Sequence, residues 1–115
     1  MPTIQLKDIW RIYLSDACGN EQSGDCLAVV LAVHDRPDMV TVVLLTENMK
    51  AMWHDYTLQI VKSSSNGLSS DMVALVFQLQ SLENTSANFK EKIGTLEDRE
   101  FVAIKKILRL LLSIT

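Results

Sequence analysis

The sequence predicts one α+β domain, mainly β, spanning residues 1–115, in which a small and strongly curved antiparallel sheet packs against a single amphipathic C-terminal helix. Three observations predict this fold class. The length of 115 residues suits one hydrophobic core, because folding at this size buries roughly two thirds of the surface that the unfolded chain exposes. Several short segments rich in β-branched and apolar residues are separated by turn-forming residues. The C-terminal segment instead carries apolar side chains at helical spacing.

The first expected strand covers residues 8–14, where three apolar residues alternate with Arg11 and Tyr13. This alternation indicates a strand with one buried face. Residues 15–24 are rich in Ser, Asp, Gly and Asn and show no apolar periodicity, so they predict a surface loop.

The next strands are expected to form the centre of the sheet. Residues 26–33 and 39–45 are β-branched apolar runs, and the turn between them contains Pro37, which cannot continue a central strand. A fourth strand is expected at residues 56–61. A fifth is expected at residues 72–82, where the length and the alternation both suit a strand.

The final element is expected to be a helix that begins at Thr95 or Glu97. Asp98 or Glu100, three residues later, would complete a capping box, and Leu96 would act as a hydrophobic staple. The expected core joins sheet residues to helix residues: Trp10, Ile12, Val30, Val43 and Leu75 against Phe101, Ile104 and Leu108.

Composition and charge narrow the class of protein. With 48% hydrophobic and 22% charged residues, the chain is globular rather than disordered. Its apolar runs are far shorter than the roughly 20 residues that span a bilayer, so no membrane segment is expected. The N-terminus lacks the apolar region of a secretory signal, which favours the cytoplasm. The net charge of -3 means that any role in RNA binding must depend on a local patch.

The two cysteines, Cys18 and Cys26, show neither a CxxC spacing nor the Cys/His spacing of a metal site. Because the cytosol keeps most thiols reduced, both are expected to be free thiols.

Several motifs follow one another in a recognisable order. Residues 8–10 read Asp-Ile-Trp, residues 19–24 read Gly-Asn-Glu-Gln-Ser-Gly, and a Val-rich strand follows at residues 28–31. Residues 42–46 read Val-Val-Leu-Leu-Thr, and residues 93–96 read Ile-Gly-Thr-Leu before the final helix. In these motifs and their order the chain resembles the MazF/PemK/Kid toxin family over nearly its whole length.

The resemblance implies an SH3-like small antiparallel barrel, as in MazF, PemK and CcdB, and a homodimer. It implies the toxin of a type II toxin-antitoxin system, which cleaves single-stranded mRNA without a metal or other cofactor and which a cognate antitoxin inhibits by occupying the RNA groove. It assigns catalytic roles to Glu21 in the loop motif and to Thr46 at the end of a strand. The residues that it places in contact with RNA are Asn20, Gln22, Gln78 and Gln80.

The departures from the family pattern concern the chemistry. Cys26 stands where the family has its catalytic Arg and Leu27 replaces the following Pro, while Phe77 and Gln80 replace the Asp and the second Arg of the D-Q-x-R motif. Cleavage of this type needs a base, an acid and a cation that stabilises the extra negative charge on the phosphate. A cysteine supplies no such charge, and the loss of one preorganised donor commonly slows a reaction on the order of 100-fold to 1000-fold.

Three basic residues are candidates to replace the missing charge: Arg11, Lys50 and Lys62. His34 and His54 are expected to be ordinary turn and loop residues.

The segment that follows the third strand contains Met49, Met52 and Trp53. These side chains are expected to cover the end of the barrel as part of the core. The alternative is an exposed surface that binds another protein, since Met and Trp are common on such surfaces.

The sequence therefore leaves two classes of function open. The first is a toxin-type endoribonuclease that is weak or altered because its Arg is replaced. The second is a catalytically silent dimeric module that binds an antitoxin, RNA or another protein.

Overall fold

The computed structural model describes residues 3–13 and 25–113. Within these ranges the chain forms six antiparallel strands, one 3-10 helix and one α-helix. In chain order the elements are β1 (Asp8–Tyr13), β2 (Asp25–Val33), β3 (Met39–Thr46), η1 (Met49–Trp53), β4 (Thr57–Ile60), β5 (Met72–Glu83), β6 (Phe89–Thr95) and α1 (Asp98–Leu112).

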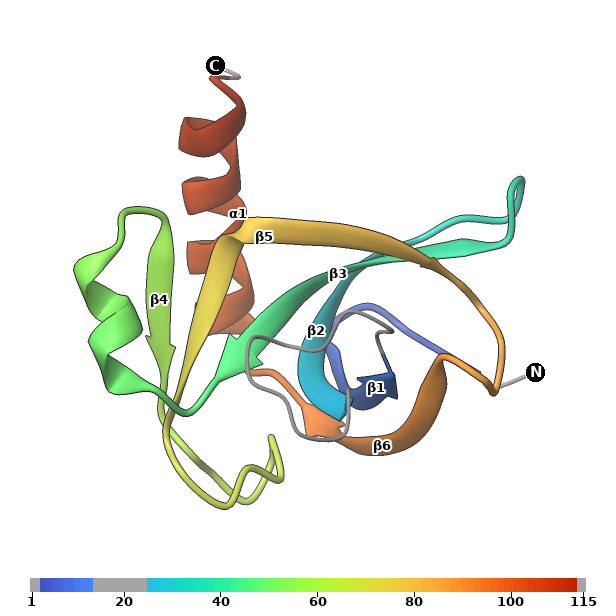
Figure 1. The fold of residues 1–115 in the computed structure, drawn as a ribbon, viewed down its shortest axis with the longest axis horizontal. Coiled ribbons are helices and arrows are strands. Elements are labelled where there is room, and N and C mark those ends of the chain that lie inside the picture. The colour runs from blue at the N-terminus through green and yellow to red at the C-terminus, as the bar shows by residue number, and fades with distance from the viewer. Residues whose placement is uncertain (1–2, 14–24, 114–115) are drawn as a thin grey trace.

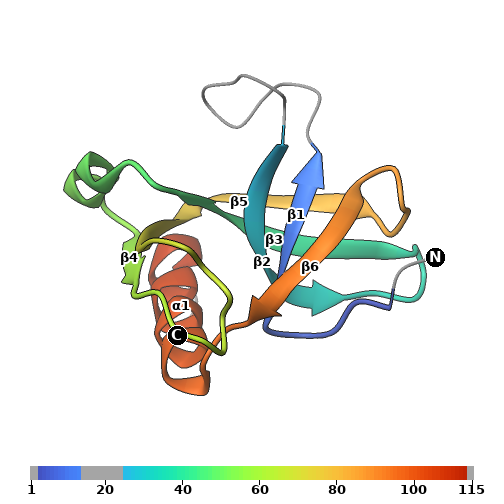
Figure 2. The ribbon, with the colours of Figure 1, turned by 90° about the horizontal axis from the view of Figure 1, so that it is seen from below.

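The six strands form one strongly curved sheet in the order β4-β5-β3-β2-β1-β6 (Figure 1). α1 and β4 lie at one end of the molecule, and β1, β2 and β6 curl together at the other end (Figure 2). The sheet is barrel-like without being closed, because β4 and β6 remain as its two edges. The predicted fold class, a mainly β domain with a small barrel-like sheet and a C-terminal helix, is confirmed.

The five expected strands are present, and their described ends lie within one residue of the predicted bounds. β6 was not predicted. Its sequence is largely polar and exposed, and it pairs along β1 with Ile12 opposite Phe89 and Trp10 opposite Lys92. A polar edge strand lacks apolar alternation, so it is recognised only from its hydrogen-bonded pairing with a neighbouring strand.

The hydrophobic core has two parts, one on each face of the sheet. The first part joins sheet residues such as Val43 to Phe101 and Ile104 of α1. The second part lies inside the curl of the sheet and contains Trp10 and Val30. The two parts are separate because neighbouring residues of a strand point to opposite faces.

The predicted core is wrong for Leu75, which belongs to neither part, and partly wrong in the contacts of the other residues. Trp10, Ile12 and Val30 are buried, but they pack inside the curl with Phe89 rather than against α1. Leu75 is half-buried.

The start of α1 differs from the predicted capping box. Glu97 is the N-cap residue and its side chain makes no capping hydrogen bond, while Thr95 belongs to β6. The staple fits better, since Leu96 and Phe101 are buried in the same core cluster. Among the described residues, no helix combines the length and the hydropathy that a bilayer crossing requires.

A buried asparagine holds the loop that joins β4 to β5. The Asn66 side chain is fully buried, and its Oδ1 accepts hydrogen bonds from the N–H groups of Ser63 at 2.9 Å and Leu68 at 3.0 Å. Its Nδ2 donates to the carbonyl oxygen of Val61 at 2.9 Å. Because these backbone groups are satisfied internally, the loop is a fixed support against which β6 packs.

Glu100 gives the fold a pH-dependent contribution to stability. Burial raises the pKa of its carboxyl, although the N–H of Val61 donates to its Oε2 at 3.4 Å. Its Oε1 is buried without a partner among the described residues. The folded state therefore binds this proton more tightly than the unfolded state, and the resulting stability is present at low pH and lost as the pH rises through the folded pKa.

Wild type loses this contribution between pH 4 and pH 7, whereas Glu100→Gln has no carboxyl to titrate there. The free energy of unfolding of the variant, relative to wild type, should therefore increase over this range. The increase should be only roughly 0.5 kcal/mol, because solvent screens a half-buried carboxylate. Urea unfolding at both pH values measures the difference. An identical difference at pH 4 and pH 7 would contradict this role for Glu100.

Candidate functional site

Thr46 ends β3 at the rim of the curled sheet. It is half-buried and lies opposite Val73 of β5. Its Oγ1 accepts a hydrogen bond from the N–H of Asn48 at 3.2 Å, and the Asn48 Oδ1 in turn accepts from the N–H of Lys50 at 3.1 Å. The bond from Asn48 fixes the hydroxyl while leaving its own O–H to donate to a ligand.

The register of β2 and β3 brings Cys26 to the same rim. Leu27 lies opposite Leu45, so the residues next to them, Cys26 and Thr46, sit at the same ends of adjacent strands and on the same face. Cys26 is half-buried and packs against the part of the core inside the curl. The structure thus brings together two of the predicted site positions.

Cys26 is disulfide-bonded. The expectation of two free thiols is therefore wrong for Cys26, and Cys18 lies outside the described residues. In this state the sulfur of Cys26 carries neither a positive charge nor a nucleophilic thiolate.

The other predicted site residues do not all meet Thr46. Gln80 is half-buried opposite Val42, four residues from Thr46 along β3 and so about 13 Å away. Gln78 is exposed where β5 bulges between the pairs Val43–Leu79 and Leu44–Leu75. The remaining predicted site residues, Asn20, Glu21 and Gln22, lie outside the described residues.

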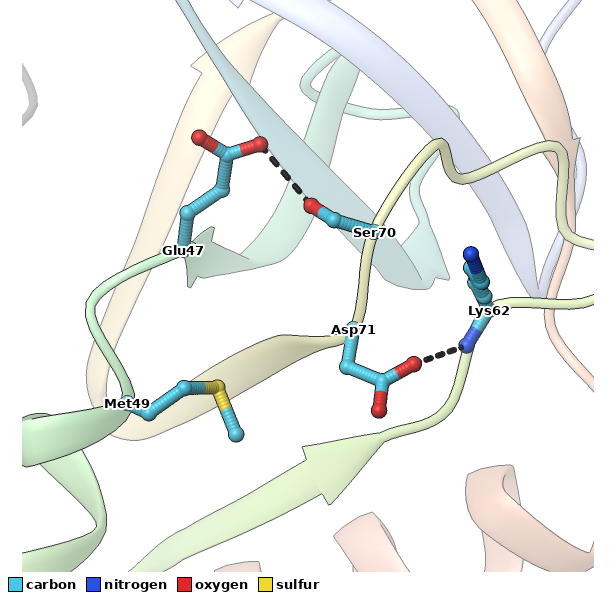
Figure 3. Close-up of a pocket in the computed structure, with 5 residues that line it drawn as sticks. All are labelled: Glu47, Met49, Lys62, Ser70 and Asp71. Carbon is cyan, nitrogen blue, oxygen red and sulfur yellow. Dashed lines mark hydrogen bonds between the residues drawn. The ribbon is translucent and has the colours of Figure 1, made fainter.

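A shallow pocket of about 600 Å³ opens next to the end of β3 (Figure 3). We call it the β3-end pocket, and its lining residues are Glu47, Met49, Lys62, Ser70 and Asp71. The hydroxyl of Ser70 donates to Glu47 Oε2 at 2.9 Å, and the backbone N–H of Lys62 donates to Asp71 Oδ1 at 2.9 Å. Both carboxylates are therefore held in place by neighbouring donors.

Sequence reasoning named Lys62 but missed Glu47, Ser70 and Asp71. They come from loops that are distant in sequence and that meet because Thr46 pairs with Val73. The β3–β5 register, which no single-sequence pattern specifies, was the signal needed to find them.

The three candidate cations have different surroundings. The guanidinium of Arg11 forms an ion pair with Glu91 of β6. Lys50 is exposed on η1, and Lys62 lines the β3-end pocket. Of the three candidates, Lys62 is thus the one that the structure places in the pocket beside Thr46.

The two histidines occupy the predicted kinds of position. His34 lies in the turn after β2, and its Nε2 is 3.2 Å from Thr41 Oγ1. His54 follows η1, with its ring centroid 5.7 Å from that of Phe77.

The Asp-Ile-Trp motif stabilises the start of β1. Asp8 is buried, and its Oδ2 accepts hydrogen bonds from Trp10 Nε1 at 3.1 Å and from the N–H of Gln5 at 2.9 Å. Lys92 of β6 lies 3.3 Å from Asp8 Oδ1. The motif therefore joins β1, β6 and the N-terminal segment.

The expectation that Met49, Met52 and Trp53 belong to the core is wrong. No residue of η1 is buried, and Trp53 is 87% exposed. η1 lies against β4 and β5, but its large side chains Met49, Met52 and Trp53 remain exposed to solvent.

Comparison with known proteins gives two positive findings and one negative. The sequence model of a family described as "PemK-like, MazF-like toxin of type II toxin-antitoxin system" matches residues 6–112. The crystal structure of MazF (Form-I) from Deinococcus radiodurans is similar, with a TM-score of 0.74 and 17% identity over 98% of this chain and 99% of that one. At this identity the structural likeness shows the fold alone. A search of curated proteins found no match.

Proposed function

Because the chain belongs to the PemK-like, MazF-like toxins of type II toxin-antitoxin systems, we propose that it is a slow, metal-independent endoribonuclease that acts on single-stranded RNA. The observation that carries this proposal is that Thr46 and Cys26 lie at the same ends of adjacent strands, at the rim of the sheet. The Thr46 hydroxyl is fixed there, Lys62 lines the β3-end pocket that begins at the next residue, Glu47, and Cys26 replaces the family Arg.

In this proposal each group has a defined task. Glu21 accepts the proton of the ribose 2'-hydroxyl, whose oxygen then attacks the adjacent phosphorus. The bond from phosphorus to the 5'-oxygen breaks, which leaves a 2',3'-cyclic phosphate, and the departing 5'-oxygen takes up a proton from Glu21 or from water. The Thr46 O–H donates to a phosphate oxygen, and the Lys62 ammonium offsets only a small part of the developing negative charge, because Glu47 and Asp71 line the same pocket. Lys62 is a flexible point charge, so it stabilises the phosphate less well than the two-pronged guanidinium that the family motif carries. The rate is therefore low.

The test is cleavage of a fluorescent single-stranded RNA of mixed sequence by the purified protein in the presence of EDTA. We expect slow cleavage that Thr46→Ala reduces by a further tenfold or more, because a preorganised donor is lost. Thr95→Ala, which removes an exposed hydroxyl from the end of another strand, is the matched control. Equal rates for wild type and Thr46→Ala would exclude Thr46 from the chemistry.

A second candidate function, a catalytically silent binding module, is favoured by the charges of the β3-end pocket. Glu47 and Asp71 outnumber Lys62 there, so the pocket disfavours a phosphate. Such a module would keep the dimer and the groove for a cognate antitoxin or another partner. Cleavage that is absent from wild type and from every variant, in protein that is folded, would support it.

We also propose that the protein is a homodimer in the cytoplasm. The family forms dimers generally, and α1 exposes large apolar side chains, among them Val102, Leu110 and Leu112 at 47%, 70% and 51%. Their burial in a dimer interface would remove this apolar surface from water. Analytical ultracentrifugation at micromolar concentration should give twice the chain mass of 12.9 kDa. A single 12.9 kDa species would contradict the dimer.

A further inference from the structure

Four large apolar side chains are exposed together on and just after η1. They form what we call the η1 patch: Met49, Met52, Trp53 and Tyr56, at 41%, 40%, 87% and 39% exposure. An almost fully exposed Trp side chain leaves a large apolar surface in water, and this surface is buried only when another molecule covers it. Met and Trp are also the side chains that interface cores favour over the rest of a protein surface.

The η1 patch continues into the β3-end pocket through Met49, which belongs to both. Figure 3 shows the Met49 side chain extending from η1 towards the segment that carries Asp71. An apolar surface and a polar recess are therefore joined in one continuous site.

The recess is built to receive positive charge. The Ser70 hydroxyl orients Glu47, and the backbone N–H of Lys62 with the side-chain amide of Gln59, at 3.4 Å, orients Asp71. Among the described side chains, no ion pair involves Glu47, Asp71 or Lys62. Two oriented carboxylates and one ammonium thus line the recess, in a chain whose net charge is also negative.

We propose that this joined site binds a peptide segment of a partner protein in which an arginine or lysine stands next to bulky apolar residues. The cation enters the β3-end pocket between Glu47 and Asp71, where charge-assisted hydrogen bonds fix it. The apolar neighbours cover Met49, Met52 and Trp53, and the indole face offers a further contact to a cation. This inference goes beyond the RNA chemistry, since it requires neither cleavage nor Thr46.

The charge of the recess decides between two kinds of occupant. A single-stranded nucleic acid would also stack on Trp53, but its phosphates would meet two carboxylates. A basic and apolar peptide satisfies both parts of the site at once.

The test uses two acetylated, amidated seven-residue peptides that alternate leucine with arginine or leucine with glutamate. The arginine peptide should bind saturably and shift Trp53 fluorescence to shorter wavelength, because it displaces water from the indole. Glu47→Gln combined with Asp71→Asn should weaken its binding about tenfold and remove the preference over the glutamate peptide. Trp53→Ala should abolish the fluorescence shift, since the other tryptophan, Trp10, is buried.

The matched control is Asp35→Asn combined with Glu83→Gln, which changes the net charge equally at exposed positions near the turn between β2 and β3. It should bind the arginine peptide like wild type. The proposal is overturned if the two peptides bind alike, if the control loses as much affinity as the pocket variant, or if a single-stranded RNA but not the arginine peptide shifts Trp53. RNA cleavage is measured in a separate assay. A negative result with the peptides therefore does not bear on the proposed ribonuclease activity.

Discussion

Gly94→Ala is expected to destabilise the protein by about 3 kcal/mol, which corresponds to a fall of about 12 °C or more in Tm. A Cβ at Gly94 would lie 2.3 Å from the carbonyl carbon and oxygen of Asn66 and 2.8 Å from the carbonyl oxygen of Ser65. These are backbone atoms of a loop that the buried Asn66 side chain holds from within. The loop cannot retreat cheaply, and the N–H of Thr95, which donates to Ser65 at 3.0 Å, would be displaced as well.

Thr95→Ala is the matched control for this prediction, because it changes the adjacent and exposed side chain while leaving the backbone contacts in place. It should change the free energy of unfolding by no more than about 0.5 kcal/mol. Urea unfolding of wild type and both variants measures the two effects. A Gly94→Ala variant as stable as the control would show that β6 and the loop are not packed as described.

Gly94 also explains one motif of the sequence in physical terms. The Ile-Gly-Thr-Leu motif combines a residue that must lack a side chain with Leu96, which is buried beneath the start of α1. The motif therefore belongs to the packing of β6 and α1. In the same way, Asp8 and Trp10 of the first motif contact each other and serve the fold.

Sequence reasoning located most of the fold because the apolar strands and the amphipathic helix carry strong periodic signals. It failed for β6, whose exposed residues Lys90, Glu91 and Lys92 show no apolar alternation. It also joined the two halves of the core into one, since a curved sheet with both faces buried does not reveal which residues share a face.

The candidate site was predicted less completely than the fold. The family motifs led to Thr46 and Cys26, which the structure brings to one rim. The β3-end pocket depends on the pairing of β3 with β5, and Glu47 and Asp71 belong to no motif. The exposure of η1 was missed because Met and Trp suit a core as well as an interface.

Cys26→Arg is expected to raise the rate of RNA cleavage on the order of 100-fold over wild type, because it returns a preorganised cation to the phosphate beside Thr46. The substitution also removes the disulfide of Cys26. Cys26→Ser removes the same disulfide without adding charge and is therefore the matched control. Circular dichroism and urea unfolding must first show that both variants are folded.

Adding Gln80→Arg to Cys26→Arg should strengthen RNA binding and make it more sensitive to salt. Each new phosphate contact on a single strand adds roughly 0.7 to the slope of log affinity against log salt concentration. Because Gln80 lies about 13 Å along the strand from Thr46, its effect should fall on affinity more than on the rate of the cut. Phe77→Asp completes the family motif at an exposed position, where the fold should tolerate it.

The most direct test of the account is the single-turnover rate of single-stranded RNA cleavage by Cys26→Arg divided by the rate of Cys26→Ser. We predict a ratio on the order of 100 or more, with wild type close to the serine variant, because the missing cation limits the chemistry. A ratio near one, together with rapid cleavage by wild type that Thr46→Ala abolishes, would contradict it. That result would mean that another residue already supplies the charge that Cys26 lacks.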